Sequence, residues 1–519
     1  MITAQINLTH QLNEICYNFT YNDSWSFINI NKGEKVESHF SEELHFTTNT
    51  YTYTNSISTS YYIQEGLIPY STRDAEGNSI DVFTSISQNF ALTNLPLFFG
   101  KADLVKIPSK IKYALTQIPT NILKEVHPDK QVAYELCLLF VSQLTSTYFE
   151  VKAETNPEGW KSLNSTYLSE LIGVDSCCYK RVREVLEYKL ENGAIIQCDY
   201  KKISGKRNYH YRIGSWYLDK SVHAFKLQTE IAKKSLYKHY LKSFARASEN
   251  SICRNLFNLY ICIQLPTLTE IEQEASRLIK QGYINKKGKT LVRRNKHSNN
   301  YFKNINQLAF VEDAIEIFKY LTNEKGVLIP VVGGEQAGGR IVDSFTLMPS
   351  WIRNMVTIKG QRLVECDYQC LHPNIAMSMY GGSSKFLTHS QLAINLNLNV
   401  LTVKKEHLSF FNKPIIQMMQ SPLWKYYLEK EPIMLQNLVS DKLNNSIQPS
   451  NEKHKITSRK LFKMEVNIMT KVIEKLNAEG IYVMYVYDAL YCLPEQKNIV
   501  QKVMNTVILA EGVHTSVKI

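Results

Sequence analysis

Two apolar segments in the last third of the chain each run into an aspartate. Residues 361–377 predict a strand that ends in Asp367, followed by a turn and a helix. A later segment predicts a helix, a strand over 481–486, a turn that contains Asp488, and a second strand over 490–493. An acid at a strand end and an acid in a β-turn can be brought side by side by an antiparallel sheet.

Paired carboxylates suggest metal chemistry at this place. Two of them can share two divalent cations, which activate a hydroxyl and neutralise a triphosphate in an in-line displacement. The alternative is two unrelated turn aspartates, because Asp is a common turn residue. The shared context after apolar strands favours a site for two Mg²⁺ or Mn²⁺ ions. Glu365 lies one pleat from Asp367, as an accessory acid or a salt-bridge partner.

A second pattern, which predicts two helices and two strands, lies nearer the middle of the chain. Residues 165–173 predict a capped helix that ends at a glycine, and residues 175–190 predict a second helix. Two strands follow, over 193–200 and 209–213, with a turn between them. This order of elements is that of a winged helix.

Basic residues occupy the places where a winged helix touches phosphates. They are Lys180, Arg181 and Arg183 on the second helix, and Lys206 and Arg207 at the wing tip. A module used only for packing is the alternative, and the local charge favours nucleic acid. A basic stretch over 286–297, which includes Arg293 and Arg294, is either a solvated loop or a clamp on a duplex backbone.

The chain as a whole is expected to be an α+β protein of several domains. We predict a small antiparallel catalytic sheet backed by helices, with reduced fingers. The expected division is an N-terminal domain of unknown role, a winged-helix domain, a mostly helical thumb-like region and a catalytic region. The N-terminal domain is expected over 1–155 and the winged-helix domain over 156–220. The thumb-like region is expected over 221–335 and the catalytic region over 336–519.

Composition narrows the class of protein. The 519 residues are 44% hydrophobic and 21% charged, which excludes a largely disordered chain, a collagen and a coiled-coil rod. A formal net charge of +12 favours polyanionic partners. The ten cysteines show no paired spacing and no CxxC motif for zinc, which predicts reduced thiols and a cytoplasmic protein. The apolar run 132–141 is too short to span a bilayer, so we expect a core helix and no membrane partner.

The two aspartate segments resemble motifs of nucleic acid polymerases. The segment 363–377 looks like motif A of the polymerase palm, with an Asp-Tyr start similar to that of family A DNA polymerases. The segment 480–492 looks like motif C, with Tyr487 in the place of the usual histidine. The stretch 338–353 resembles uncharacterised bacterial proteins of mobile elements that combine a winged helix with a palm.

This resemblance implies roles for individual residues. Asp367 and Asp488 would bind the two metal ions, assisted by the backbone carbonyl of Tyr368. His372 stands where relatives place the residue that packs against the sugar of the incoming nucleotide. A core histidine bonded to a backbone carbonyl is an equal alternative for His372.

No segment matches the family A motif B. The nearest candidate, 403–412, offers Lys404, Lys405 or His407 for the triphosphate, or else is a solvated basic helix start. Arg353 is a further candidate for phosphate or template backbone, as is Arg340.

The sequence thus predicts a template-dependent nucleotidyltransferase, closest to a DNA polymerase, that acts on primer–template DNA and nucleoside triphosphates. Replication of a mobile element is the expected setting. The alternatives are a primase or RNA polymerase with the same palm, and a non-catalytic winged-helix initiator or regulator. A nuclease or transposase that recruits Glu465 as a third acid is a weaker one.

Overall fold

The computed structural model describes most of the chain beyond residue 102. The described residues are 72–73, 79–80, 103–199, 208–219, 221–294, 305–322, 326–383, 385–444 and 450–519. The chain divides into two compact units, Met1–Pro69 and Tyr70–Ile519, and the described residues all belong to the second.

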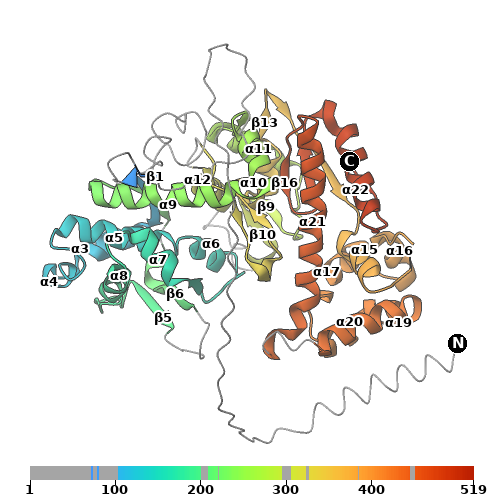
Figure 1. The fold of residues 1–519 in the computed structure, drawn as a ribbon, viewed down its shortest axis with the longest axis horizontal. Coiled ribbons are helices and arrows are strands. Elements are labelled where there is room, and N and C mark those ends of the chain that lie inside the picture. The colour runs from blue at the N-terminus through green and yellow to red at the C-terminus, as the bar shows by residue number, and fades with distance from the viewer. Residues whose placement is uncertain are drawn as a thin grey trace, which may run out of the picture. The chain divides into compact units, whose positions relative to one another are not determined.

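Helices make up most of the described chain (Figure 1). Those of the first half are α3 (Ser109–Thr116), α4 (Thr120–Leu123), α5 (Lys130–Ser142), α6 (Ser146–Lys152), α7 (Ser165–Ile172), α8 (Cys178–Leu186), α9 (Glu230–Ser248) and α10 (Ser251–Tyr260). Those of the second half are α11 (Leu268–Lys280), α12 (Val311–Thr322), α13 (Ser344–Leu347), α14 (Ser350–Arg353), α15 (Leu371–Met379), α16 (His389–Leu396), α17 (Val400–Phe410), α18 (Ile415–Met419), α19 (Pro422–Lys430), α20 (Pro432–Asn444), α21 (Ile456–Ala478) and α22 (Lys497–Ala510).

The strands are short and form small sheets. They are β1 (Thr72–Arg73), β2 (Ser79–Ile80), β3 (Leu104–Pro108), β4 (Lys161–Leu163), β5 (Ile196–Asp199), β6 (Tyr209–Ile213), β7 (Val222–Lys226), β8 (Ile263–Gln264), β9 (Thr290–Val292), β10 (Leu308–Phe310), β11 (Val331–Val332), β12 (Ile341–Val342), β13 (Thr357–Ile358), β14 (Gln361–Arg362), β15 (Val364–Tyr368), β16 (Met484–Val486), β17 (Ala489–Cys492) and β18 (Val517–Lys518). Among the described pairs all are antiparallel except β9 with β10. The mixture of helices with small antiparallel sheets agrees with the expected α+β class. No helix in the described ranges is long and apolar enough to cross a membrane.

The region around α5 forms one hydrophobic core. The helix is buried along most of its length, as the apolar run 132–141 predicts, and Asp129 caps its N-terminus. Strand β3 pairs with β7, so the segments before and after the predicted winged helix share a sheet. Core residues from Val105 to Leu236 belong to the same cluster. The expected domain boundaries at 155 and 220 therefore pass through a common core.

The elements expected between 165 and 213 are present. Gly173, with a left-handed φ of 69°, is the C-cap of helix α7, and Asn164 is its N-cap. Strand β6 lies between β4 and β5 in a three-stranded antiparallel sheet. Helix α8 buries Val182, Val185 and Leu186, in keeping with the helical spacing of its apolar residues.

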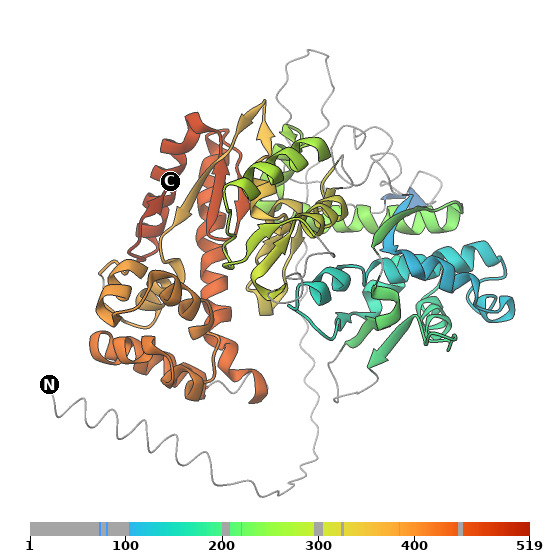
Figure 2. The same ribbon diagram turned by 180° about the vertical axis from the view of Figure 1, so that it is seen from behind.

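The second half is organised around a four-stranded sheet in the order β16-β17-β15-β18. Both views show α21 and α22 beside this sheet (Figures 1 and 2). Cys366 and Tyr368 of β15 are buried, and the Tyr368 hydroxyl donates to the Met504 carbonyl of α22 at 2.8 Å. Because side chains alternate along a strand, Glu365 and Asp367 face the opposite side, where both are partly exposed.

The glycine-rich stretch 333–339 packs against α21 instead of standing free. A Cβ on Gly338 would lie 2.5 Å from Phe462 Cβ and 2.7 Å from the Lys463 backbone nitrogen. Gly338 also has a φ of +65°, which disfavours other residues. The close approach fixes the following residues, including Arg340, against α21.

A buried asparagine connects α10 to the strand that leads into the Asp488 turn. The Asn255 side-chain amide donates to the Val483 carbonyl at 2.7 Å, and its Oδ1 accepts from the Val483 amide at 3.1 Å. Asn255 is fully buried. One side chain thus satisfies both backbone groups of Val483 without solvent.

We expect Asn255→Ala to destabilise the protein by about 1–3 kcal/mol, because it leaves two buried backbone groups unpaired. Urea unfolding measures this change, with the exposed Asn395→Ala as the control. An equal stability of the two variants would contradict the assigned role of Asn255.

Candidate active site at the end of β15

The hairpin between β16 and β17 carries the second aspartate. Val486 pairs with Ala489, so Tyr487 and Asp488 form a two-residue loop. Tyr487 has a φ of 57°, as the first loop residue of a type II′ turn requires, although a bulky residue is strained there. The loop therefore holds Asp488 in a defined position at the end of the sheet.

Strand pairing brings this loop to the end of β15. Asp367 is paired with Ala489, and the Tyr368 amide donates to the Asp488 carbonyl at 3.3 Å. Asp488, 121 residues after Asp367 in sequence, is thus the loop residue directly before the residue that pairs with Asp367. The strand register therefore places Asp367 next to the loop that carries Asp488, and the metal-binding role of the two residues stays a prediction.

The electrostatics of the two carboxylates depend on each other and on burial. Burial, with the charges of Asp488 and Glu365, raises the pKa of Asp367 to about 7, while Lys286 and Lys404 act in the opposite direction. Burial and the charge of Glu465 raise the pKa of Asp488 to about 6, against the influence of His372 and Arg340. Concentrated negative charge of this kind is relieved by a proton or by a metal cation.

An ion pair whose charges act on Asp488 connects the residue after the glycine-rich stretch to α21. The Glu465 side chain is fully buried and accepts two bonds from Arg340, at 2.8 Å from Nε and 2.5 Å from Nη2. The guanidinium of Arg340 also lies over the Phe462 ring at 3.7 Å and the Tyr487 ring at 4.9 Å. Arg340 therefore contacts both α21 and the loop that carries Asp488.

His372 belongs to the same cluster. Its Nε2 lies 2.7 Å from Glu465 Oε2 and 3.1 Å from Arg340 Nη2, and its side chain is 25% exposed. Both contacts are with charged side chains, so within the described residues the structure does not show a core histidine bonded to a backbone carbonyl. Its sugar-contacting role stays a prediction.

Glu465 is not available as a free third acid. Burial alone would raise the pKa of Glu465, but the hydrogen bond and charge of His372 and the charge of Arg340 outweigh it and lower that pKa. Its carboxylate is already neutralised by the bidentate arginine. This arrangement removes the support for a nuclease that recruits Glu465.

Two lysines lie close enough to act on Asp367. Lys286, from the basic stretch, is 3.7 Å from Glu365, which makes that acid a salt-bridge partner. Lys404 of α17 is exposed, and its charge lowers the pKa of Asp367. Lys405 is also exposed. Lys404 is thus the lysine of the predicted 403–412 segment whose charge acts on Asp367.

Two other predicted phosphate ligands are buried. Arg353 is only 8% exposed and lies 5.7 Å from the centres of the Phe345 and Tyr491 rings. His407 is 6% exposed, and its Nε2 lies 2.8 Å from the Tyr427 hydroxyl. The expectation that His407 meets a triphosphate is corrected: α17 turns this side chain into the protein interior.

The predicted nucleic-acid contacts differ in their surroundings. Lys180 is exposed on α8. The arginines are held in ion pairs: Arg181 with Asp175, Arg183 with Glu184, Arg293 with Glu272 and Arg294 with Asp313. Lys206 and Arg207 lie outside the described residues. The contact roles of all these residues stay predictions.

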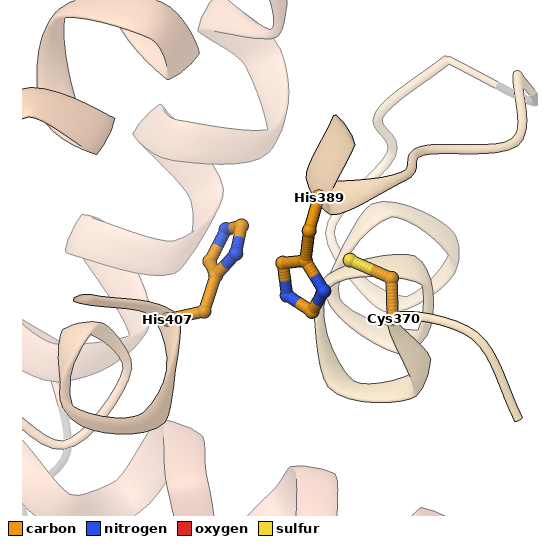
Figure 3. A group of neighbouring side chains, drawn as sticks. All are labelled: Cys370, His389 and His407. Carbon is orange, nitrogen blue, oxygen red and sulfur yellow. The ribbon is translucent and has the colours of Figure 1, made fainter. Parts of the chain in front are cut away.

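One group of side chains was missed by sequence analysis. Cys370, His389 and His407 come together although they lie 19 and 18 residues apart on separate elements (Figure 3). Burial lowers the pKa of His389 to about 4 and of His407 to about 3, so both rings are neutral at neutral pH. No short sequence motif predicts this group, because its three residues meet only through the packing of α16 and α17.

Comparison with known proteins adds a distant structural likeness. No protein-family model and no curated protein matches the chain. Among solved structures, the POL domain of Pol1 from M. smegmatis, in complex with DNA primer–template and dNTP, matches with a TM-score of 0.35 and 11% sequence identity. The match covers 56% of this chain and 75% of that chain. So weak a likeness to a DNA polymerase domain does not establish a shared fold or activity.

The raised pKa values predict how stability depends on pH without divalent cations. A folded-state pKa of about 6 for Asp488, above its usual 3.8, gives stability that is present at pH 4 and lost as pH rises to about 6. We expect Asp488→Asn to gain about 1–2 kcal/mol of stability relative to wild type between pH 4 and pH 7, because the amide stays neutral where the buried carboxylate must ionise. Unfolding in urea with EDTA measures this shift. The exposed carboxylate variant Asp219→Asn is the control, and an identical pH profile for all three proteins would refute the prediction.

The Arg340–Glu465 pair predicts a large loss of stability on truncation. We expect Arg340→Met to cost about 3 kcal/mol, because it leaves a fully buried carboxylate without its cation. Arg277→Met breaks an exposed pair with Glu274 and should change stability little. Chemical denaturation of both variants makes the comparison, and equal losses would show that the Glu465 charge is compensated in another way.

Proposed function

We propose that the protein is a template-dependent nucleotidyltransferase of the DNA polymerase type, which adds nucleotides to a 3′-hydroxyl. One observation carries the proposal: antiparallel pairing of β15 with β17 places Asp367 beside the loop that holds Asp488. The sequence around both residues resembles palm motifs A and C. The substrates would be a nucleic acid primer–template and nucleoside triphosphates.

The donor set fits Mg²⁺ or Mn²⁺. Both ions prefer carboxylate oxygens, and the negative charge of the two aspartates is left uncompensated by any direct ion pair in the described residues. Bound there, two such ions would lower the pKa of the attacking hydroxyl and neutralise the triphosphate. Asp367 and Asp488 would hold them, with the Tyr368 carbonyl as a further oxygen.

The surrounding side chains have separate tasks in this proposal. Lys404, on the exposed face of α17, would contact phosphate oxygens as a point charge. His372 would meet the sugar of the incoming nucleotide from its partly exposed position. Arg340 and Glu465 would position His372 and the Asp488 loop without touching the substrate.

The segment from β4 to β6 would supply nucleic-acid binding. We infer a winged helix there, because two helices precede two strands and β6 lies between β4 and β5. Helix α8 would enter a groove, with the exposed Lys180 on a phosphate. Replication of a mobile element is the setting that we propose for the combined activities.

Primer extension tests the catalytic proposal directly. We expect extension of a primed DNA template with dNTPs and Mg²⁺ or Mn²⁺, and a loss of about 10³-fold or more in Asp367→Asn and Asp488→Asn, since each removes a metal-binding charge. Asp219→Asn retains both proposed ligands and should extend as wild type does.

The type of nucleotide incorporated distinguishes a DNA polymerase from a primase or RNA polymerase. Extension with rNTPs in place of dNTPs, again lost in Asp488→Asn, would indicate a primase or RNA polymerase with the same palm. If neither set is incorporated with or without a template, the catalytic proposal fails. DNA binding that persists in that case would favour the non-catalytic winged-helix regulator.

A further inference from the structure

Three potential metal ligands converge beside the candidate active site. Cys370 is the N-cap of α15, His389 is the first residue of α16, and His407 lies in the second half of α17. One ligand atom from each lies within 4.8 Å of the others. Figure 3 shows His389 between the other two, with its ring directed toward both.

The hydrogen bonding of His407 leaves one nitrogen free in the interior. Its Nε2 is engaged by the Tyr427 hydroxyl at 2.8 Å. Its Nδ1 is buried and has no hydrogen-bond partner among the described residues. Leaving a buried polar atom unpaired is costly, so this nitrogen needs a partner that the described residues do not provide. Metal-bound histidines characteristically use the second ring nitrogen to bond an oxygen, as His407 does with Tyr427.

Cys370 occupies an unusual backbone conformation for its residue type. Its φ of 55° lies in the left-handed region, which a non-glycine residue adopts at a cost. The strained turn places the buried thiol near His389 (Figure 3). Thiol and imidazole together are the donor set of zinc and similar borderline cations, and carboxylate-preferring Mg²⁺ does not favour them.

We propose that Cys370, His389 and His407 bind one divalent cation of the zinc class. Ligand atoms around a tetrahedral zinc lie about 3.5 Å apart, so small side-chain rotations close the present separations. Three protein ligands leave the fourth position to water. The ion is distinct from the pair proposed at Asp367 and Asp488, both in ligand chemistry and in residues.

The position of this site gives it a structural consequence. Cys370 follows Asp367 by three residues, and the buried His407 lies one helical turn after the exposed Lys404 on α17. A cation bound by all three ligands would connect the turn after β15 with the start of α16 and with α17. It would thereby fix the distance between Asp367 and the lysine whose charge acts on it.

Metal analysis of the purified full chain tests the proposal. We expect close to one zinc per chain after purification from zinc-supplemented medium, and a thiolate-to-metal charge-transfer band when Co²⁺ replaces zinc. Cys370→Ser should abolish the band, and His389→Gln and His407→Gln should each weaken Zn²⁺ binding by about 10-fold or more. Asp488→Asn should leave Zn²⁺ binding unchanged, which separates this site from the proposed catalytic one.

Matched variants control for general damage to the fold. Cys262→Ser replaces an exposed cysteine, and His239→Gln replaces a buried histidine near Tyr167, so neither should alter Zn²⁺ binding. If Cys370→Ser fails to fold, the partly exposed His389→Gln decides the matter. Absence of Zn²⁺ binding to the wild type, or binding that survives both Cys370→Ser and His389→Gln, would overturn the proposal, whatever the result of primer extension.

Discussion

The antiparallel pairing of β15 with β17 is the constraint on which the candidate site depends. Its register sets Asp367 opposite Ala489 and bonds the Tyr368 amide to the Asp488 carbonyl. A one-residue slip would turn Asp367 to the buried face, where α22 leaves room for Cys366 and Tyr368 instead. The buried face of the sheet therefore fixes the position of the acids on the other face.

Polar contacts from distant segments support this register. Asn255 satisfies the backbone of Val483, just before β16, and Arg340 extends from the glycine-rich stretch to Glu465 and the Tyr487 ring. Each contact compensates a group that would be costly to bury alone. The strained Tyr487 turn is held between them, so Asp488 gains a defined position from residues more than 100 positions away in sequence.

The acidic side chains around the candidate site differ in how their charge is compensated. Glu465 is neutralised by Arg340, whereas Asp367 and Asp488 have no such direct partner in the described part of the chain. Lys286 and Lys404 approach from the exposed side. A neutralised buried pair beside two less compensated carboxylates is the arrangement that the proposed metal-binding site would require.

The sequence alone determined the local elements and the two acids. Apolar strands ending in Asp367 and turning at Asp488 are local patterns, as are α5, α7 and the long helix α21, because helix and strand periodicity depend on near neighbours. Tertiary structure decided which side chains meet. The pairing of Arg340 with Glu465, the burial of His407 and the gathering of Cys370 with two histidines depend on contacts between separate elements, for which no short spacing in the chain gives a signal.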